Sequence, residues 1–247
     1  MLLSDTTAAL RRTLDDIAKM NPQPRFIVAS GDLTNQGNAA AYALLREMMA
    51  QATVPVIYTL GNHDTREGFV AEFGDLHSDP ALPYNTDMVV AGIHVIALDS
   101  SVPDEIGGSW EPGQIDWLME RLADHADLPK LLVMHHAPML DLDNKKMEWE
   151  SLSAVATEEL RTAIEGHNVV GLLAGHIHLD RATHWHGVPV FVGQGLHAGS
   201  DPLDLVTGLG MLDATGFGIA TLRPSGLTMT YAAHPQSRAL LHRLDFE

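Results

Sequence analysis

The sequence contains no cysteine, and this absence excludes both a disulfide framework and a thiolate metal site. No apolar run approaches the ~18 residues that a membrane-spanning helix needs. Residues 1–5 show neither the basic flank nor the apolar stretch of a signal peptide. We therefore expect no membrane partner and take the reducing cytoplasm as the default location, although a cysteine-free chain is compatible with any compartment.

Basic residues are also scarce: 15 Lys and Arg stand against 32 Asp and Glu, which gives a formal charge of −17. Proteins that bind nucleic acid usually carry a basic surface that displaces counterions from phosphates. A chain this acidic repels a long polyanion unless metal ions create a local positive site. We therefore expect no nucleic-acid partner, whereas a small phosphorylated substrate drawn to a metal centre is compatible with the charge.

What is present is the pattern of one large globular domain. Apolar residues make up 45% of the chain and charged residues 19%, so disorder is excluded as the main interpretation. A chain of 247 residues is long enough to bury a large core. We expect a single domain over residues 1–247.

Short β-rich runs alternate with amphipathic helices, which indicates a layered α/β fold. Helices are predicted at residues 5–20, 39–52, 111–123 and 152–165. Strands are predicted at residues 25–30, 54–60, 88–91, 94–98, 130–134 and 169–174. From Val188 onward, short β runs are interrupted by glycines, and we interpret them as a second sheet packed on the first.

Four of the predicted strands end in polar clusters: Gly31-Asp32, Gly61-Asn62-His63-Asp64, His135-His136 and Gly175-His176-Ile177-His178. In open α/β sheets the carboxyl ends of the strands form the ligand-binding crevice. Asp, Asn and His side chains together suit Mn²⁺, Fe, Zn²⁺ or Co²⁺. In a His-x-His triplet the two imidazoles point the same way when the segment is extended.

Each cluster alone is weak evidence, because Gly-Asp is common and a lone histidine is more often structural than a ligand. The run after Gly61 is stronger, since a turn with an Asn cap does not require a histidine. Four such clusters, each at the end of a predicted strand, together predict a metal centre.

This set of motifs resembles the calcineurin-like metallophosphoesterase superfamily. The run Gly31 to Gly37 (Gly-Asp-Leu-Thr-Asn-Gln-Gly), the doubled His135-His136-Ala-Pro and the Gln114-Ile-Asp-Trp-Leu helix are similar to bacterial class III cyclic-nucleotide phosphodiesterases and glycerophosphodiesterases. The resemblance implies two mixed β-sheets packed together and flanked by helices, a four-layer αββα sandwich.

The resemblance also implies two divalent metal ions, each Mn, Fe, Zn or Co. Asp32 would bridge them; Asn62, His135 and His176 would complete one site, and His178 would belong to the other.

Three further histidines receive roles from the same resemblance. His63 would not be a ligand but would face the substrate phosphate, stabilising charge or assisting the leaving oxygen. His136, beside a ligand, and His197, in Gly195-Leu-His, would line the pocket.

The sequence departs from the family at its beginning. Members open with a strand carrying Asp-x-His, which supplies two ligands to the metal that His178 serves. Here Asp5-Thr6-Thr7 has threonine in place of the imidazole, so we interpret Asp5 as a helix N-cap. Either the chain starts at an internal methionine of a longer protein, which we favour, or it functions without the strand. We expect one complete metal site and one depleted site.

The resemblance implies a metal-dependent phosphodiester hydrolase that acts by attack of a metal-activated hydroxide. Its substrates would be small phosphodiesters such as 3',5'-cyclic nucleotides or glycerophosphodiesters. The alternative is an inactive or weakly active metal- or phosphate-binding pseudoenzyme. A nuclease is disfavoured by the negative charge. The family also makes a homodimer or higher homo-oligomer an alternative to a monomer.

Overall fold

The structure is a computed structural model that describes residues 4–142, 149–205 and 207–246. Within it the chain forms two compact units. The larger unit contains residues 25–176 and 184–190, and the smaller unit contains residues 1–24, 177–183 and 191–247. The expected single domain over residues 1–247 stays a prediction, and each unit is described below by itself.

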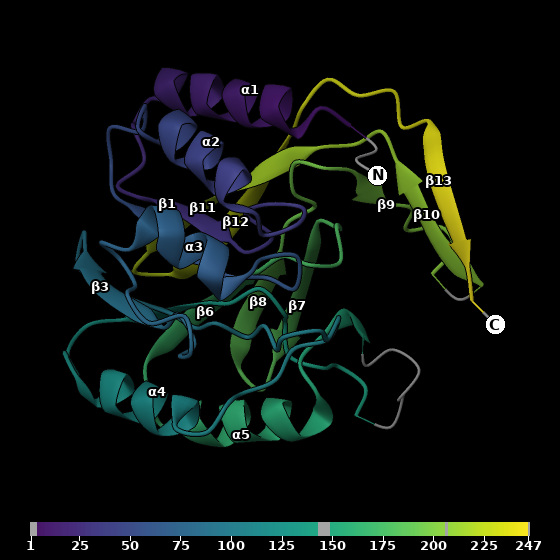
Figure 1. Cartoon of the computed structure of the whole chain (residues 1–247). Helices are drawn as coiled ribbons and strands as arrows, with labels where there is room; N and C mark the ends of the chain where they lie inside the picture. The colour runs from purple at the N-terminus through teal and green to yellow at the C-terminus, as the bar shows by residue number, and fades with distance from the viewer. Residues whose placement is uncertain (1–3, 143–148, 206, 247) are drawn as a thin grey trace. The chain divides into compact units, whose positions relative to one another are not determined.

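The larger unit contains most of a six-stranded sheet with the order β3-β4-β5-β6-β8-β7. Figure 1 labels β3, β6, β7 and β8 of this sheet. The strands are β3 (Thr86–Val90), β4 (Ile93–Ala97), β5 (Lys130–Val133), β6 (Val169–Ala174), β7 (Arg181–Trp185) and β8 (Val188–Val192). β3 pairs antiparallel with β4, whereas β4–β5 and β5–β6 are parallel. All four residues of β5 are buried, as expected for a central parallel strand covered on both faces.

A second pair of parallel strands, β1 (Ile27–Ser30) and β2 (Val56–Thr59), carries the first two motifs. The end of β2 is tied to the end of β4, because the Thr59 hydroxyl donates a buried hydrogen bond of 2.7 Å to the carbonyl oxygen of Leu98. The polar segments that follow β2 and β4 therefore start from adjacent positions.

Four helices of the larger unit form two packed pairs, α2 with α3 and α4 with α5 (Figure 1). They are α2 (Ala39–Met49), α3 (Arg66–Phe73), α4 (Gln114–Ala123) and α5 (Ala154–Ile164). Asn38, Thr65 and Ser153 each cap a helix by accepting a hydrogen bond from a first-turn amide. These caps define where α2, α3 and α5 begin.

An aromatic cluster packs α2 and α3 against β2 and the segment before β3. Tyr42, Tyr58, Phe69, Phe73 and Tyr84 are all buried. Phe69 and Phe73 stack with ring centroids 4.8 Å apart, and Tyr84 lies 4.7 Å from Phe69. Each such ring stabilises the fold by roughly 1.5–3 kcal/mol through apolar burial. The cluster contacts the motif that follows β2 through Tyr42, whose hydroxyl donates a 2.7 Å hydrogen bond to Asp64.

The smaller unit contains α1 (Thr6–Lys19), a three-stranded sheet and a hairpin. The sheet has the order β13-β10-β9, and the hairpin consists of β11 and β12. The bounds are β9 (Gly199–Ser200), β10 (Gly208–Leu212), β11 (Gly216–Arg223), β12 (Gly226–Ala233) and β13 (Leu240–Asp245). Asp5 is the N-cap of α1, because its Oδ1 accepts a 2.9 Å hydrogen bond from the amide of Ala8. The interpretation of Asp5 as a cap is confirmed.

The predicted α/β fold class is confirmed. The described strands form four hydrogen-bonded sheets, whereas the resemblance implied two packed mixed sheets. Most element bounds move by one to three residues. α4 begins at Gln114 and not at Glu111, because Gly113, with φ of +89°, stands at the N-cap position. The Gln114 side chain accepts a 2.7 Å hydrogen bond from the amide of Glu111. The sequence patterns did not predict α3, β7 or β13. Among the described residues, the structure contains no helix long and apolar enough to cross a membrane.

Candidate metal centre

Asp32 follows β1 in a left-handed backbone conformation, with φ of +50° after Gly31 at +89°. Such conformations are costly for residues with a side chain and cluster at functional sites. Gly31 is required here: a Cβ at this position would lie 2.5 Å from Nδ1 of His135. Because glycine has no Cβ, β1 can approach the imidazole that follows β5. The Asp32 carboxylate consequently meets that ring, with Oδ1 3.3 Å from Nε2 of His135.

A backbone carbonyl determines which nitrogen of His135 faces the centre. Nδ1 lies 2.8 Å from the carbonyl oxygen of Ser30, and a carbonyl can only accept, so Nδ1–H is the donor. In the neutral ring the lone pair is then on Nε2. That atom lies 3.3 Å from Asp32 Oδ1 and 3.3 Å from Nδ1 of His176.

His176 follows β6 and is oriented in the same way. It also has a left-handed backbone, with φ of +72°. Its Nε2 lies 2.7 Å from the carbonyl oxygen of Trp149, so Nε2–H donates and the lone pair is on Nδ1. When both rings are neutral, two imidazole lone pairs therefore face each other across 3.3 Å, beside a carboxylate. This arrangement is repulsive unless a proton or a metal cation lies between the rings.

The titration of the two central groups reflects the same electrostatics. Burial lowers the pKa of His135, but the charge and hydrogen bond of Asp32, together with the Ser30 carbonyl and the charge of Asp64, raise it above its ordinary value. Burial would raise the pKa of Asp32, yet the charge and hydrogen bond of His135, with the amide of His63, hold it well below its usual range. The surroundings of Asp32 and His135 thus favour positive charge at the centre.

Asn62 contributes a buried oxygen to the same region. Its Oδ1 has no hydrogen-bond partner among the residues that the structure describes. An unsatisfied buried polar atom costs about 1–3 kcal/mol, so this position calls for a ligand. The preceding Gly61 abuts the centre, since a Cβ there would lie 2.3 Å from Asp32 Oδ1 and 2.8 Å from His135 Nε2. The amide oxygen of Asn62 therefore belongs to a loop that is in direct contact with both.

Asp64 is the structural anchor of this loop. Its carboxylate accepts hydrogen bonds from the amides of Leu33, Thr34 and Gly61 and from the Tyr42 hydroxyl, the last at 2.7 Å. Burial, with the nearby charge of Asp32, raises the pKa of Asp64 to about 6, although its hydrogen bonds oppose the rise. The sequence patterns did not predict a role for Asp64. Its position, two residues after Asn62 and just before a helix cap, was the available signal.

His63 is exposed but fixed at its base. Its amide donates a 3.0 Å hydrogen bond to Asp32 Oδ1, which places the residue beside the centre. Its Nδ1 lies 3.1 Å from the carbonyl oxygen of Asn35, so Nδ1–H donates to that carbonyl. Nε2 is then the ring nitrogen that remains for another partner.

His136 lies close to His135 and His176, and nitrogens of the three rings fall within 4.8 Å of one another. Both nitrogens of His136 already have partners, which argues against a role as a ligand. Nε2–H donates to the carbonyl oxygen of Ile106 at 3.0 Å, so Nδ1 accepts from the Ser100 hydroxyl at 2.9 Å. Burial, with the charges that His135 and His176 can carry, holds the pKa of His136 well below its usual value.

The ring of His136 instead packs against the rings of His135 and His176. Its centroid lies 4.8 Å from that of His135 and 4.4 Å from that of His176. Gly108 makes room on the other side, because a Cβ there would lie 2.6 Å from the His136 ring. His136 is therefore a neutral side chain that supports the orientation of both neighbours.

His178 and His197 lie together in the smaller unit. His178 has φ of +52°, and its Nδ1–H donates a 2.7 Å hydrogen bond to the carbonyl oxygen of Ala198. The ring centroids of His178 and His197 are 5.9 Å apart. The structure thus brings together Asp32, His135 and His176, with Asn62 and His63 on an adjoining loop, in the larger unit. It places His178 beside His197 in the smaller one.

The triplet Asp-x-His does occur once in a different context, at Asp75-Leu76-His77 after α3. Asp75 pairs with Arg46 at 2.7 Å, and the ring of His77 bonds the carbonyl oxygen of Leu82 at 3.0 Å. These two side chains are used for local structure, so this triplet does not replace the opening strand of the family.

Curated proteins with related sequences include several phosphodiesterases. A probable cyclic nucleotide phosphodiesterase of Rhodococcus erythropolis is 32% identical over 76% of this chain and 62% of its own length. A cAMP/cGMP dual specificity phosphodiesterase of Mycobacterium tuberculosis is 31% identical over 76% of this chain and 59% of its own. A probable glycerophosphodiester phosphodiesterase of Arcobacter nitrofigilis is 27% identical over 75% and 68%. The chain thus spans less than two thirds of the length of the first two relatives.

Solved structures share the fold. The protein TT1561 of Thermus thermophilus aligns with a TM-score of 0.55 and 18% identity, covering 91% of this chain and 92% of its own. A purple acid phosphatase from yellow lupin aligns with a TM-score of 0.58 and 15% identity, covering 90% and 46%. The calcineurin-like phosphoesterase family model matches residues 2–180, a span that contains Asp32, Asn62, His135, His176 and His178. The chain therefore belongs to the calcineurin-like phosphoesterase family.

Proposed function

We propose that this protein is a metal-dependent hydrolase of small phosphodiesters, such as 3',5'-cyclic nucleotides or glycerophosphodiesters. One observation carries the proposal. His135 Nε2 lies 3.3 Å from Asp32 Oδ1 and 3.3 Å from His176 Nδ1, while backbone carbonyls hold the N–H groups of both imidazoles away from the centre. The names of the relatives support the choice of phosphodiesters as substrates.

In this proposal Asp32, Asn62, His135 and His176 hold one divalent cation. Two imidazoles, a carboxylate and an amide oxygen suit Mn, Fe, Zn or Co ions. The carbonyls of Ser30 and Trp149 orient the rings, as partners of metal-binding histidines usually do. A cation bound there would lower the pKa of water towards neutrality and offset charge on phosphoryl oxygens.

The chain's own residues then bind and orient the phosphodiester. His63 is anchored through its amide to Asp32, and its exposed ring presents Nε2. When this nitrogen is protonated it can donate a hydrogen bond to a phosphoryl oxygen or to the leaving oxygen, which stabilises developing charge. We assign His136 and His197 to the substrate pocket, the former as a support for His135 and His176.

For a second cation, the family pattern assigns only two ligands in this chain, Asp32 and His178. Because two protein ligands make a weak site, we propose that this chain binds one cation tightly and a second one weakly or not at all. This depletion favours the second candidate function, a pseudoenzyme that binds metal or phosphate with little or no turnover.

Calorimetric titration with Mn²⁺, followed by an assay on bis(p-nitrophenyl) phosphate, tests both candidates. The hydrolase proposal predicts one tight equivalent of metal and metal-dependent release of nitrophenolate. Tight binding of two equivalents would contradict the depleted second site. Metal binding without turnover, in protein shown to be folded by circular dichroism, would establish the pseudoenzyme.

The choice of substrate requires a second comparison. We expect kcat/KM for a 3',5'-cyclic nucleotide or a glycerophosphodiester to exceed that for single-stranded DNA, because the chain carries a formal charge of −17. Hydrolysis of the small substrates should depend little on salt, whereas steep salt dependence would indicate a nucleic-acid substrate. We also propose a cytoplasmic location, and sedimentation would distinguish a monomer from a homodimer or a larger homo-oligomer.

A further inference from the structure

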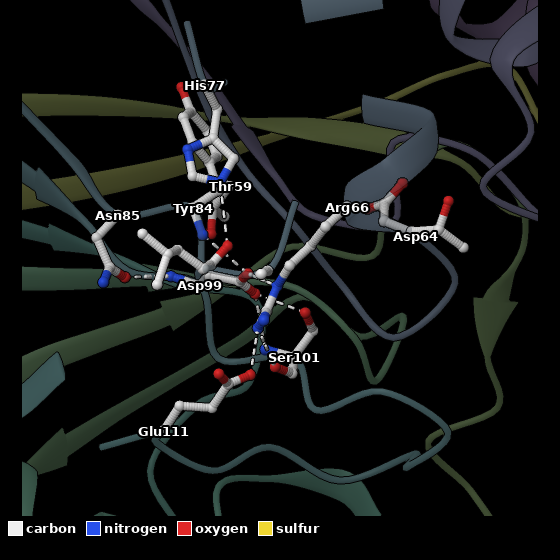
Figure 2. A network of polar contacts seen from close by, with 12 residues as sticks. Thr59, Asp64, Arg66, His77, Tyr84, Asn85, Asp99, Ser101 and Glu111 are labelled. Carbon is white, nitrogen blue, oxygen red and sulfur yellow. Dashed lines mark hydrogen bonds and ion pairs between the residues drawn. The ribbon is translucent and has the colours of Figure 1, made fainter. Parts of the chain in front are cut away.

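Arg66, the first residue of α3, forms a buried ion pair that the proposed reaction does not use. Its side chain is 9% exposed, and its Nε lies 3.0 Å from Oδ2 of Asp99, which is fully buried. Its Nη2 lies 2.7 Å from Glu111 and donates to the carbonyl oxygen of Ser101 at 3.3 Å. Figure 2 shows the guanidinium reaching from α3 into the space between Asp99, Ser101 and Glu111.

Asp99 connects the segments around the end of β4. Oδ2 accepts from Arg66 and from the amide of Tyr84, and Oδ1 accepts from the amide and the hydroxyl of Ser101. The main chain of Asp99 is held as well, since its amide donates to Asn85 and its carbonyl oxygen accepts from Gln114. The two carboxylate oxygens of Asp99 accept four hydrogen bonds, two each, some of which are drawn in Figure 2. This network restrains the segment that follows β4.

This segment leads directly to the metal centre. Ser100, the next residue, donates its hydroxyl to Nδ1 of His136 and accepts from the His136 amide at 3.1 Å. The ring of His136 packs on His135 and His176. The position of Asp99 thus affects, through Ser100 and His136, the positions of His135 and His176.

Arg66 also lies at one end of the loop that carries Asn62 and His63. Asp64 fixes one side of this loop by accepting from the amides of Leu33 and Thr34, which follow Asp32. Arg66 fixes the other side by reaching Asp99. Asn62 and His63 are therefore followed by two residues that fix the loop. Asp64 bonds the segment after Asp32, and Arg66 bonds Asp99 in the segment that contacts His136.

Stability alone does not account for such an anchor. Replacing a buried ion pair by apolar residues of similar volume is often neutral or stabilising, because desolvation cancels much of the attraction. The charged pair instead fixes geometry. A planar guanidinium bonded to a carboxylate and a carbonyl allows one position of α3 relative to β4. Small errors of about 1 Å in an active site reduce rates by about 10²-fold.

We propose that Arg66, through its ion pair with Asp99, is a positioning residue that sets the loop of Asn62 and His63 against the histidines that follow β5 and β6. The proposal rests on the proposed function, since it assigns Arg66 a part in that reaction without contact with the substrate or the cation. Glu111 adds a second carboxylate and keeps the guanidinium in its place.

The test compares Arg66→Met with Arg66→Lys and with the control Arg46→Met. Arg46 forms a comparable arginine–aspartate pair with Asp75, but both side chains are exposed, at 45% and 60%. Arg66→Lys keeps the charge without the planar fork, and it is the variant to measure should Arg66→Met not fold. For each protein we would measure the Kd for Mn²⁺, kcat and KM on bis(p-nitrophenyl) phosphate, and amide hydrogen exchange over residues 60–66 and 98–102.

We expect Arg66→Met to weaken Mn²⁺ binding by at least ~10-fold, as loss of a partner that orients ligands does. We expect kcat to fall by about 10²-fold with KM changed far less, and exchange over residues 60–66 to accelerate. Arg66→Lys should lie between, and Arg46→Met should match the wild type. A lower melting temperature for Arg66→Met with unchanged Mn²⁺ affinity, kcat and exchange would overturn the proposal.

The exchange measurement separates this inference from the proposed function. If the wild-type protein bound no Mn²⁺ and hydrolysed no diester, the proposed function would fail. Faster exchange over residues 60–66 in Arg66→Met but not in Arg46→Met would then still support the positioning role. Equal protection in both variants would refute it.

Discussion

Gly61→Ala adds one methyl group at the most crowded point of the metal centre. The new Cβ would lie 2.3 Å from Oδ1 and 2.4 Å from the amide nitrogen of Asp32, and 2.8 Å from Nε2 of His135. Ordinary van der Waals contact begins at 3.4 Å, so the carboxylate and the loop must separate by about 1.1 Å, the difference between 3.4 and 2.3 Å. The backbone nitrogen of Asp32 cannot rotate away, so the loop itself has to shift.

A shift of this size should be felt mainly by metal and substrate. We expect Mn²⁺ affinity to fall by 10–100-fold, the range for disturbed ligand orientation, and kcat on bis(p-nitrophenyl) phosphate to fall by about 10²-fold. Calorimetric titration measures the first effect and steady-state kinetics the second. Thermal unfolding in EDTA shows how much of the change is lost stability.

The matched control is Gly193→Ala. A Cβ at Gly193 meets nothing within 4 Å, and Gly193 does not have the positive φ that would strain an alanine. The Gly193→Ala variant should bind Mn²⁺ with the affinity of the wild type. Wild-type Mn²⁺ affinity in Gly61→Ala would refute the reasoning, because it would mean that Asp32 and His135 do not have to lie where the structure places them.

Three further predictions concern single side chains. Asn62→Leu removes a buried oxygen that has no partner among the described residues. In EDTA we therefore expect the melting temperature of this variant to equal or exceed that of the wild type, while the stabilisation by Mn²⁺ disappears. A large loss of stability in EDTA would show that the amide has a structural role. Ser100→Ala deletes both hydrogen bonds to His136 and should lower the free energy of unfolding in EDTA by about 1–3 kcal/mol, measured in urea, whereas an unchanged value would show that His136 finds other partners. Burial, with a smaller contribution from Arg12, lowers the pKa of His234 below 6.5, so protonation favours the unfolded state: this contribution to stability is complete above pH 6.5 and is lost as pH falls below it. The melting temperature of His234→Gln should therefore decline less between pH 7 and pH 5 than that of the wild type, and parallel declines would exclude His234 as a source of the pH dependence.

Local chemistry explains why the sequence predicted many elements correctly. Asp5 and the following turn carry the signals of a helix N-terminus, and the apolar run at residues 130–134 is typical of a buried parallel strand. Both depend on interactions within a few residues. The short α3 was not predicted, because it is stabilised by packing of Phe69 and Phe73 on Tyr42 and Tyr58, which lie elsewhere in the chain.

The candidate metal centre divides in the same way. The sequence by itself determined that Asp32, Asn62, His135 and His176 lie in polar clusters that follow predicted strands, because the residue types and the apolar runs before them are visible in order. The tertiary structure decided which nitrogen of each imidazole faces the centre. That depends on Ser30, 105 residues from His135, and on Trp149, 27 residues from His176. The Arg66–Asp99 anchor spans 33 residues and likewise exists only after folding. The motifs in the sequence predict which residues are candidate ligands. The orientation of these side chains comes from hydrogen bonds between segments that only the folded chain brings together.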